Sequence, residues 1–159
     1  MKVVIIGANG QLGSEVQALL KEQNLKVAAL THADIEITDP ENVKSVLQRE
    51  APDAVVNTAA YHNVEQCEYQ LHDAFSGNAL GAKHVAEVTE QLGCYLIHVS
   101  TDYVFDGAKQ APYIETDLPA PLNAYANTKL SGDHFVLAST ANALVMRTCG
   151  LYGRNPCRA

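Results

Sequence analysis

The sequence contains no tryptophan, only three phenylalanines, and 11 lysines and arginines against 18 aspartates and glutamates. The resulting formal charge of −7 has the wrong sign for a protein whose main partner is a nucleic-acid backbone or an anionic membrane surface. We therefore expect neither partner. A bound dinucleotide is not excluded, because backbone amides can hold phosphate groups without a net positive charge.

Paired cysteines and metal-ligand spacings are also lacking. The four cysteines, Cys67, Cys94, Cys149 and Cys157, form no Cys-x-x-Cys pair, and the six histidines are scattered along the chain. The apolar run 3–6 is too short for a signal peptide or a membrane span. These features predict a cytoplasmic protein with reduced thiols and no metal site.

What the sequence does contain is an alternation of short apolar runs with segments of helical period. Strands are expected at residues 3–6, 25–30, 53–57, 94–99 and 143–146, and helices at about residues 12–23, from 40 onward and at 74–92. Such alternation predicts right-handed βαβ units. The predicted fold is a Rossmann-type, doubly wound parallel sheet with helices on both faces. A chain of 159 residues that is 47% hydrophobic suits one such domain, residues 1–159.

Two of these helices are predicted in more detail. Asp39 has the side chain of an N-cap, and Pro40 suits the first helical position. Helical period also predicts which residues face the core. In the first helix these are Leu12, Val16, Leu19 and Leu20, and in the long third helix they are Ala79, Ala82, Val85, Ala86 and Val88.

Three glycines at three-residue spacing follow the first expected strand, in the stretch GANGQLG, residues 7–13. Gly7 would permit a tight turn, Gly10 would let the backbone approach a pyrophosphate, and Gly13 would let the helix pack closely on the strand. The pyrophosphate would meet the N-terminal amides of a helix that begins near Gln11. With a strand before it and a helix after it, this stretch predicts dinucleotide binding rather than a glycine turn without a ligand.

The end of the second strand reads Leu30-Thr31-His32 and contains no carboxylate. Many folds that prefer NAD have an acidic residue there, which holds the ribose 2′-hydroxyl. A 2′-phosphate would meet less repulsion in this chain, so NADPH should at least be tolerated. Asp34 or Glu36 could hold the ribose instead, and the cofactor is therefore expected to be NADPH or NADH.

The stretch NAYANTKLSG, residues 123–132, places Tyr125 four residues before Lys129. On a helix this spacing puts both side chains on one face, one turn apart. A carbonyl that accepts a hydride must also gain a proton. A tyrosine can donate it if its pKa, near 10 in water, is lowered, and a neighbouring ammonium is expected to lower it.

The stretch STDYVFDG, residues 100–107, follows the fourth expected strand. Ser100, Thr101 and Asp102 are expected to be exposed at the carboxyl end of that strand, where parallel sheets bind their ligands. A hydroxyl group in this place more often caps a turn. Beside a tyrosine and lysine pair, however, Thr101 is predicted to hold the substrate carbonyl, which makes Thr101, Tyr125 and Lys129 the candidate catalytic residues.

Five stretches together resemble the extended short-chain dehydrogenase/reductases: GANGQLG, AAY at residues 59–61, STDYVFDG, PLNAYANTKLSG and RTCGLYG. Within that family, the resemblance is to enzymes that reduce 4-keto-6-deoxy sugar nucleotides with NAD(P)H. It implies catalytic roles for Thr101, Tyr125 and Lys129, and substrate contacts by Thr101 and Asp102. Together with the glycine turn and the end of the second strand, it predicts cofactor contacts by Gly7, Asn9, Gly10, Gln11, Leu12, Gly13, Thr31, His32, Glu36, Ile37, Ala59, Ala60, Tyr61, Tyr125 and Lys129.

The sequence also departs from the pattern of this family. His62 stands where the family often has threonine, Glu36 and Glu65 where it has aspartate, Ala126 where it has glycine, and Gly150 where some members have tryptophan. The family continues beyond RTCGLYG into a lobe that closes over the sugar nucleotide. The resemblance therefore predicts that the C-terminal substrate lobe is missing from this chain.

Two other functions share these motifs. One is a non-catalytic regulatory subunit resembling the β subunit of methionine adenosyltransferase, because a fold can keep its residues and change its role. The other is a sugar-nucleotide epimerase or dehydratase of the same superfamily. The expected partner is a sugar-nucleotide substrate, and a homo-oligomer is left open.

Overall fold

Five parallel strands form the sheet of the computed structural model, which describes residues 1–153. They are β1 (Lys2–Ile6), β2 (Lys26–Leu30), β3 (Ala54–Asn57), β4 (Tyr95–Thr101) and β5 (Ala143–Thr148), in the spatial order β2-β1-β3-β4-β5. The chain leaves β1 toward one edge and then crosses back to place β3 on the other side of β1. The carboxyl ends of β1 and β3 therefore border a topological switch point, where such sheets bind ligands.

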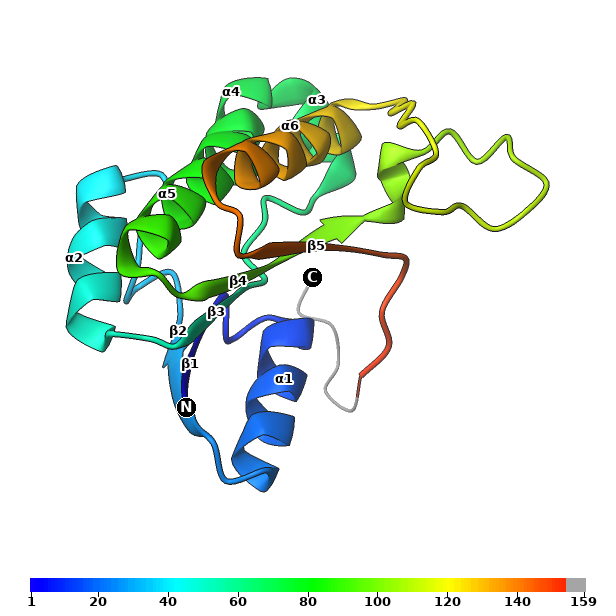
Figure 1. The fold of residues 1–159 in the computed structure, drawn as a ribbon. Helices are drawn as coiled ribbons and strands as arrows, with labels where there is room; N and C mark the ends of the chain where they lie inside the picture. The colour runs from blue at the N-terminus through cyan, green and yellow to red at the C-terminus, as the bar shows by residue number, and fades with distance from the viewer. Residues whose placement is uncertain (154–159) are drawn as a thin grey trace.

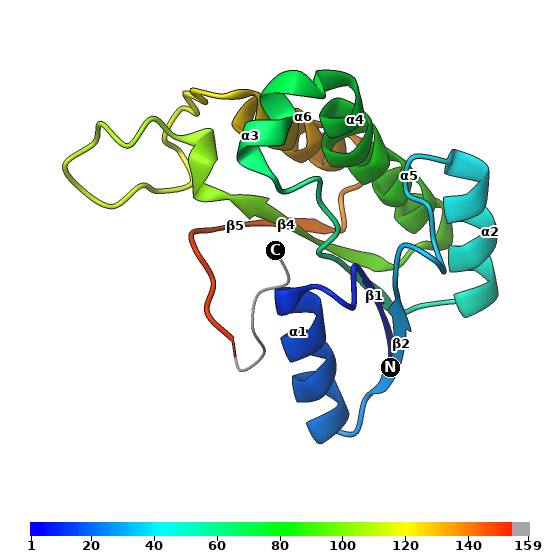
Figure 2. The same cartoon turned by 180° about the vertical axis from the view of Figure 1, so that it is seen from behind.

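Helices cover both faces of this sheet, which confirms the predicted doubly wound fold (Figures 1 and 2). Helix α1 (Gln11–Glu22) packs on one face, whereas α2 (Pro40–Glu50), α5 (Ala82–Leu92) and α6 (Ala124–Ser139) pack on the other. Asp39 caps α2 as predicted, because its carboxylate accepts hydrogen bonds from the backbone amides of Glu41 and Asn42.

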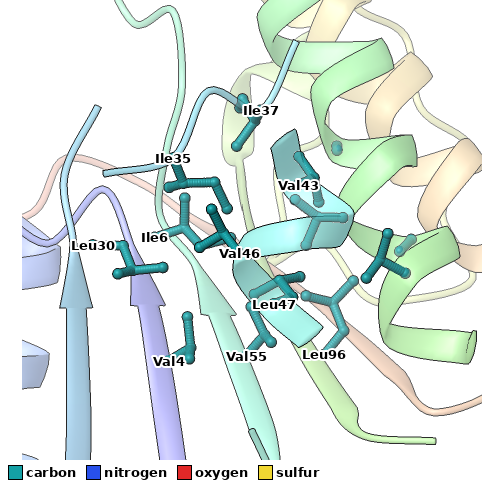
Figure 3. Packing of buried hydrophobic residues seen from close by; sticks show 14 of the residues in the cluster. Val4, Ile6, Leu30, Ile35, Ile37, Val43, Val46, Leu47, Val55 and Leu96 are labelled. Carbon is teal, nitrogen blue, oxygen red and sulfur yellow. The ribbon is translucent and has the colours of Figure 1, made fainter. Parts of the chain in front are cut away.

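The hydrophobic core has two layers because successive side chains of a strand point to opposite faces. Val4, Ile6 and Val55 point toward α2 and α5 (Figure 3). Val3, Ile5 and Val56 point toward Val16 and Leu20 of α1. The apolar face predicted for the third helix is confirmed, and all five of its residues are buried. Leu19 was expected to join Val16 and Leu20, but its side chain is 56% exposed, so α1 presents a narrower face to the sheet.

The segment between β3 and β4 is more divided than the single predicted helix. It consists of α3 (Val64–Tyr69), α4 (Leu71–Phe75), a π-helical segment (Ser76–Gly81) and then α5. A Cβ atom at Gly81 would lie 2.8 Å from the Ile37 side chain, so this turn runs very close to the loop after β2. The wide π turn places the Asn78 side chain in the interior, where it is only 1% exposed.

Cys67, Cys94 and Cys149 are free cysteines, and Cys157 lies outside the described residues. Within residues 1–153, the helices are too short or too polar to cross a membrane.

Candidate active site

The glycine turn after β1 has the geometry that its sequence predicted. Gly7 has a positive φ of 80°, and a Cβ there would lie 2.9 Å from both the Ala59 amide nitrogen and the Thr58 hydroxyl oxygen. A Cβ at Gly13 would lie 2.4 Å from the Gly7 carbonyl oxygen. Gly7 and Gly13 therefore allow the turn and α1 to pack tightly, as expected.

Gly10 has a different role from the other two glycines. It is the N-cap of α1, with no side chain to satisfy the first amides of the helix. A Cβ there would approach only the Gly7 carbonyl oxygen, at 3.3 Å. The start of α1 therefore lines the cleft without a side-chain cap, and a helix N-terminus of this kind can bind phosphate.

The loop after β2 carries two carboxylates in separate environments. Asp34 accepts hydrogen bonds from the Thr31 amide and hydroxyl, which lower the pKa of its carboxyl group. Glu36 faces the cleft beside His32, with 3.3 Å between the His32 Nε2 atom and a Glu36 carboxylate oxygen. Burial raises the pKa of Glu36, but hydrogen bonds from Thr38 outweigh it and leave that pKa lowered. Of the two acidic residues considered for the ribose, only Glu36 lines the cleft.

Asn78 is a buried polar residue that the sequence analysis missed. Its Oδ1 atom accepts from the Tyr61 amide at 2.8 Å, and its Nδ2 atom donates to the Tyr61 carbonyl and to the Thr128 hydroxyl, both at 3.1 Å. Asn78 therefore connects the loop after β3 to α6. The sequence feature that could have identified it is an asparagine between Gly77 and Gly81, inside a segment of helical period.

The end of β4 differs from its prediction. Ser100 and Thr101 are the last two residues of the strand and are 4% and 6% exposed, so the expectation that both are exposed is wrong. The reason is that β5 pairs with one edge of β4 as far as Thr101, and α6 packs against one face of β4. Asp102 is exposed, as expected, and begins a short 3₁₀ turn.

Tyr125 and Thr101 are brought together as predicted. Tyr125 lies in the first turn of α6, where the Asn123 side chain caps the helix by accepting from the Ala126 amide. Burial raises the pKa of the Tyr125 phenol, and a hydrogen bond with the Thr101 side chain lowers it in part. The Tyr103 ring meets the Tyr125 ring edge-on, with 5.9 Å between ring centres.

The electrostatic expectation for Tyr125 is wrong in this structure, because the net shift of its pKa is upward and the Lys129 ammonium is not among its causes. The Lys129 Nζ atom instead donates to the Val99 carbonyl oxygen at 2.8 Å and lies 3.4 Å from the His98 Nε2 atom. Burial lowers the pKa of Lys129 to about 8, against the opposing effect of Asp133. At neutral pH the phenol therefore keeps its proton and Lys129 keeps its charge.

The predicted site residues surround one cleft of about 1240 Å³ at the carboxyl ends of the strands. Its lining comes from every predicted segment: the glycine turn, the end of β2, residues 59–61, the end of β4 and the first turns of α6. All predicted catalytic, cofactor and substrate residues are among the lining residues. The cleft is also lined by segments that were not predicted from the sequence, which include Ser76 and Gly77 of the π turn, Thr148 at the end of β5 and residues 149–151 after it.

The last of these segments closes one side of the cleft. The Gln11 side chain donates from Nε2 to the Leu151 carbonyl oxygen at 2.9 Å, which ties the chain after β5 to the start of α1. Gln11, predicted as a cofactor contact, thus also contacts the protein backbone. Within residues 1–153, no group of three or more His, Cys, Asp or Glu side chains is placed to hold a metal ion.

The sheet is parallel and doubly wound, and its glycine turn precedes a helix N-terminus that has no side-chain cap. Thr101, Tyr125 and Lys129 lie around one cleft at the carboxyl ends of the strands. These features are those of a Rossmann-type protein of the extended short-chain dehydrogenase/reductase class. The particular family follows from residues 1–158, which match the model described as the RmlD substrate binding domain. The chain belongs to this family.

Relatives and solved structures agree with this assignment. A dTDP-4-dehydrorhamnose reductase of Mycobacterium tuberculosis is 41% identical over 155 residues, which cover 95% of this chain and 50% of the relative. The crystal structure of a dTDP-4-dehydrorhamnose reductase from Clostridium acetobutylicum superposes with a TM-score of 0.95 at 39% identity, covering 99% of this chain and 56% of that one. The enzyme of the same name from Bacillus anthracis, in complex with NADP, superposes with a TM-score of 0.94 at 35% identity, covering 98% of this chain and 55% of that one. The chain thus spans about half the length of these relatives.

Proposed function

We propose that this chain is the cofactor-binding and catalytic half of an NAD(P)H-dependent reductase of a 4-keto-6-deoxy sugar nucleotide. The proposed reaction converts dTDP-4-dehydrorhamnose to dTDP-L-rhamnose in nucleotide-sugar biosynthesis. The observation that carries the proposal is the single cleft that joins a phosphate-binding helix end to Thr101, Tyr125 and Lys129. The names of the relatives support the choice of substrate.

The cofactor would lie along the carboxyl ends of β1, β2 and β3. Its pyrophosphate would meet the N-terminal amides of α1 from Gln11 onward, and its adenosine ribose would lie near His32 and Glu36. The His32 ring could donate a hydrogen bond to a 2′-phosphate, whereas the Glu36 carboxylate would accept a hydrogen bond from a 2′-hydroxyl. The site therefore has groups suited to NADPH and to NADH, and the NADP complex of the Bacillus anthracis enzyme supports the former.

The protein side chains would handle the proton of the reaction. Bound NAD(P)H supplies a hydride to the carbonyl carbon of the sugar. Thr101 and Tyr125 would hydrogen-bond the carbonyl oxygen, and the phenol of Tyr125 would donate its proton to that oxygen as the negative charge develops there. The raised pKa of Tyr125 suits a group that must hold its proton until this moment. The Lys129 ammonium would then stabilise the tyrosinate that remains.

A chimeric protein tests this proposal. Residues 1–153 of this chain would be joined to the second half of the Mycobacterium tuberculosis relative, and the loss of NADPH absorbance would be followed with dTDP-4-dehydrorhamnose as substrate. We expect steady turnover that the Tyr125→Phe variant loses while it still binds NADPH. A folded chimera that binds NADPH and shows no turnover would instead favour the regulatory subunit, and steady interconversion of sugar epimers without net NADPH loss would favour an epimerase.

A further inference from the structure

A buried polar network lies directly behind Lys129, away from the cleft. His98 of β4 and Asp133 of α6 are 1% and 0% exposed, and Arg147 of β5 reaches Asp133 with 3.2 Å between Nε and Oδ2. Asp133 follows Lys129 by four residues, so Tyr125, Lys129 and Asp133 form a single row on α6. The proposed proton transfer uses the first two members of this row and leaves the third without a role.

The hydrogen bonds of this network determine which nitrogen of His98 carries the proton. The Asn57 Oδ1 atom accepts from the Ala59 amide at 3.1 Å, so the Asn57 Nδ2 group must face the His98 Nδ1 atom, 3.3 Å away. An amide nitrogen can only donate, which makes Nδ1 the acceptor and places the ring proton on Nε2. Burial, followed by the charge of Lys129, lowers the pKa of His98 well below its usual value, so the ring is neutral.

The proton on the His98 Nε2 atom has one suitable acceptor. Nε2 lies 3.4 Å from the Lys129 Nζ atom, but an ammonium has no lone pair to accept with. Nε2 also lies 3.9 Å from the Asp133 Oδ1 atom, and Oδ1 is one of two buried polar side-chain atoms within residues 1–153 that have no hydrogen-bond partner. If the His98 Nε2 and Asp133 Oδ1 atoms moved slightly closer, they would form a hydrogen bond and both would have a partner. A continuous series of hydrogen bonds would then run from Asn57 through His98 to Asp133.

We propose that Asp133, held by Arg147 and by the Nε2 proton of His98, is a positioning residue that keeps the Lys129 ammonium charged and fixed beside the cleft. The inference rests on the proposed function, since it concerns how Lys129 is prepared for its role there. A fully buried ammonium loses its hydration, and it stays charged only where an opposite charge and hydrogen-bond acceptors replace the water. Asp133 supplies that charge, and the Val99 carbonyl supplies an acceptor.

The charged and titratable groups around Lys129 come from three elements. His98 faces it from β4, Asp133 and Tyr125 lie on α6 itself, and Arg147 reaches Asp133 from β5. Arg147 opposes Asp133 in sign and would weaken its effect on Lys129. Farther out, the groups that face Tyr125 are Cys67, Asp102 and Tyr103. A test of Asp133 must therefore separate its own charge from that of Arg147.

Titration of the lysine side chains in the 159-residue protein, by NMR of ¹³C-labelled lysine, tests the proposal without any turnover. In Asp133→Asn we expect the pKa of Lys129 to fall clearly below about 8, and in Asp133→Glu to return toward that value. An unchanged pKa in Asp133→Asn would overturn the proposal. The double variant that combines Asp133→Asn with Arg147→Met gives a second way to overturn it. If the pKa of Lys129 in that variant equals the pKa in the parent, the fall seen in Asp133→Asn is caused by the unpaired Arg147 guanidinium.

Helix α5 offers a matched control. Lys83 and Glu87 have the same four-residue spacing, with 3.4 Å between Nζ and Oε1, but both side chains are exposed, at 39% and 43%. Solvent screens such a pair, so Glu87→Gln removes a carboxylate at the same spacing and should leave the pKa of Lys129 at about 8. A fall in the pKa of Lys129 of equal size in Glu87→Gln and in Asp133→Asn would contradict a special role for Asp133.

A second measurement needs no variant and remains decisive if Asp133→Asn does not fold. ¹⁵N NMR of the histidine rings in the parent protein should show His98 neutral near pH 7, with its proton on Nε2. A proton on Nδ1, or a charged ring, would overturn the network on which the proposal rests. Neither measurement depends on substrate, so a failed turnover assay and a failed positioning role remain distinguishable.

Discussion

Lys129 and Tyr125 show what residue spacing can establish and what it leaves open. Four-residue spacing on a helix was enough to place both side chains beside the same cleft. It could not give the direction of the pKa shift of Tyr125, because that depends on how deeply α6 packs against β4. Burial dominates there and raises the pKa. The Lys129 ammonium is not among the causes of this shift.

The first prediction concerns the charge of Lys129 in turnover. In the chimera, Lys129→Met keeps most of the side-chain length but removes the ammonium, so we expect the rate to fall about 10²-fold or more near pH 7, the scale of a lost acid–base contribution. The parent rate should also decline as pH rises above about 8, where Lys129 loses its proton. NADPH oxidation measured across pH checks both effects. Equal rates for parent and variant would remove Lys129 from the mechanism.

The same residue should make stability depend on pH in a defined direction. The pKa of an exposed lysine, as in the unfolded chain, is 10.5, whereas that of Lys129 in the folded protein is about 8. Between these two pH values the unfolded chain therefore binds more protons than the folded protein. Stability must then rise with pH across this window, and the cost of burying the charge is fully present below about pH 8. At about 1.4 kcal/mol per pH unit the effect is on the order of 3 kcal/mol.

Urea unfolding of the parent and of Lys129→Met, at pH values from 8 to 10.5, measures this term. The free energy of unfolding of the parent should rise relative to that of the variant as pH increases. A constant difference between the two proteins would show that Lys129 does not titrate in this range.

At the scale of elements, two glycines of the turn between β1 and α1 are expected to have different roles, Gly10 in binding the cofactor and Gly13 in folding. Gly10→Val adds a side chain where only the Gly7 carbonyl oxygen is near, at 3.3 Å, and φ of −74° at this position suits any residue. We expect the free energy of unfolding to stay within about 1 kcal/mol of the parent, the scale of a helix N-cap change. NADPH binding, followed by the fluorescence of the cofactor, should be lost because the valine occupies the approach of the pyrophosphate.

Gly13→Ala is the matched comparison in the same turn. Its Cβ would lie 2.4 Å from the Gly7 carbonyl oxygen, and backbone cannot yield as a flexible side chain can. We expect destabilisation by about 1–3 kcal/mol, the usual cost of overpacking. If Gly10→Val still bound NADPH as tightly as the parent, the turn would not be the phosphate site.

Most of these elements could be predicted, and the exceptions have physical causes. The strands were recognisable because both faces of a parallel sheet are covered, which makes their apolar runs continuous, as in Val3–Ile6. The π turn at Ser76–Gly81 was not, because its hydrogen bonds depend on the close packing of Gly81 on Ile37 and of Gly132 on Asn78. The network of His98, Asp133 and Arg147 was equally out of reach, since residues 98, 133 and 147 meet only once β4, α6 and β5 are in place.

At the scale of the whole molecule, one face of the sheet is only partly covered near β5 by the part of the chain that the structure describes. Ala143 and Val145 of β5 pack toward the layer of α2 and α5, so Leu144 and Met146 point to the face that carries α1, and they are 53% and 46% exposed. Leu144 pairs with Ile97 of β4, which lies on the same face. We therefore expect the 159-residue polypeptide to associate with itself at increasing concentration. Sedimentation analysis checks this expectation, with Leu144→Lys and Met146→Lys together as the variant that should restore a monomer.

The length of this chain relative to its relatives leads to the last prediction. A reductase of this kind must hold its sugar nucleotide over the cofactor, and positioning contributes on the order of 7–11 kcal/mol in well-oriented systems. Residues 1–153 provide the glycine turn, Thr101, Tyr125 and Lys129, whereas the relatives are about twice as long as this chain. We expect the purified 159-residue polypeptide to bind NADPH weakly and to show essentially no turnover of dTDP-4-dehydrorhamnose, while the chimera turns over under the same conditions. Robust turnover by a mass-verified 159-residue chain would contradict this, and would mean that the substrate site lies entirely beside these five strands.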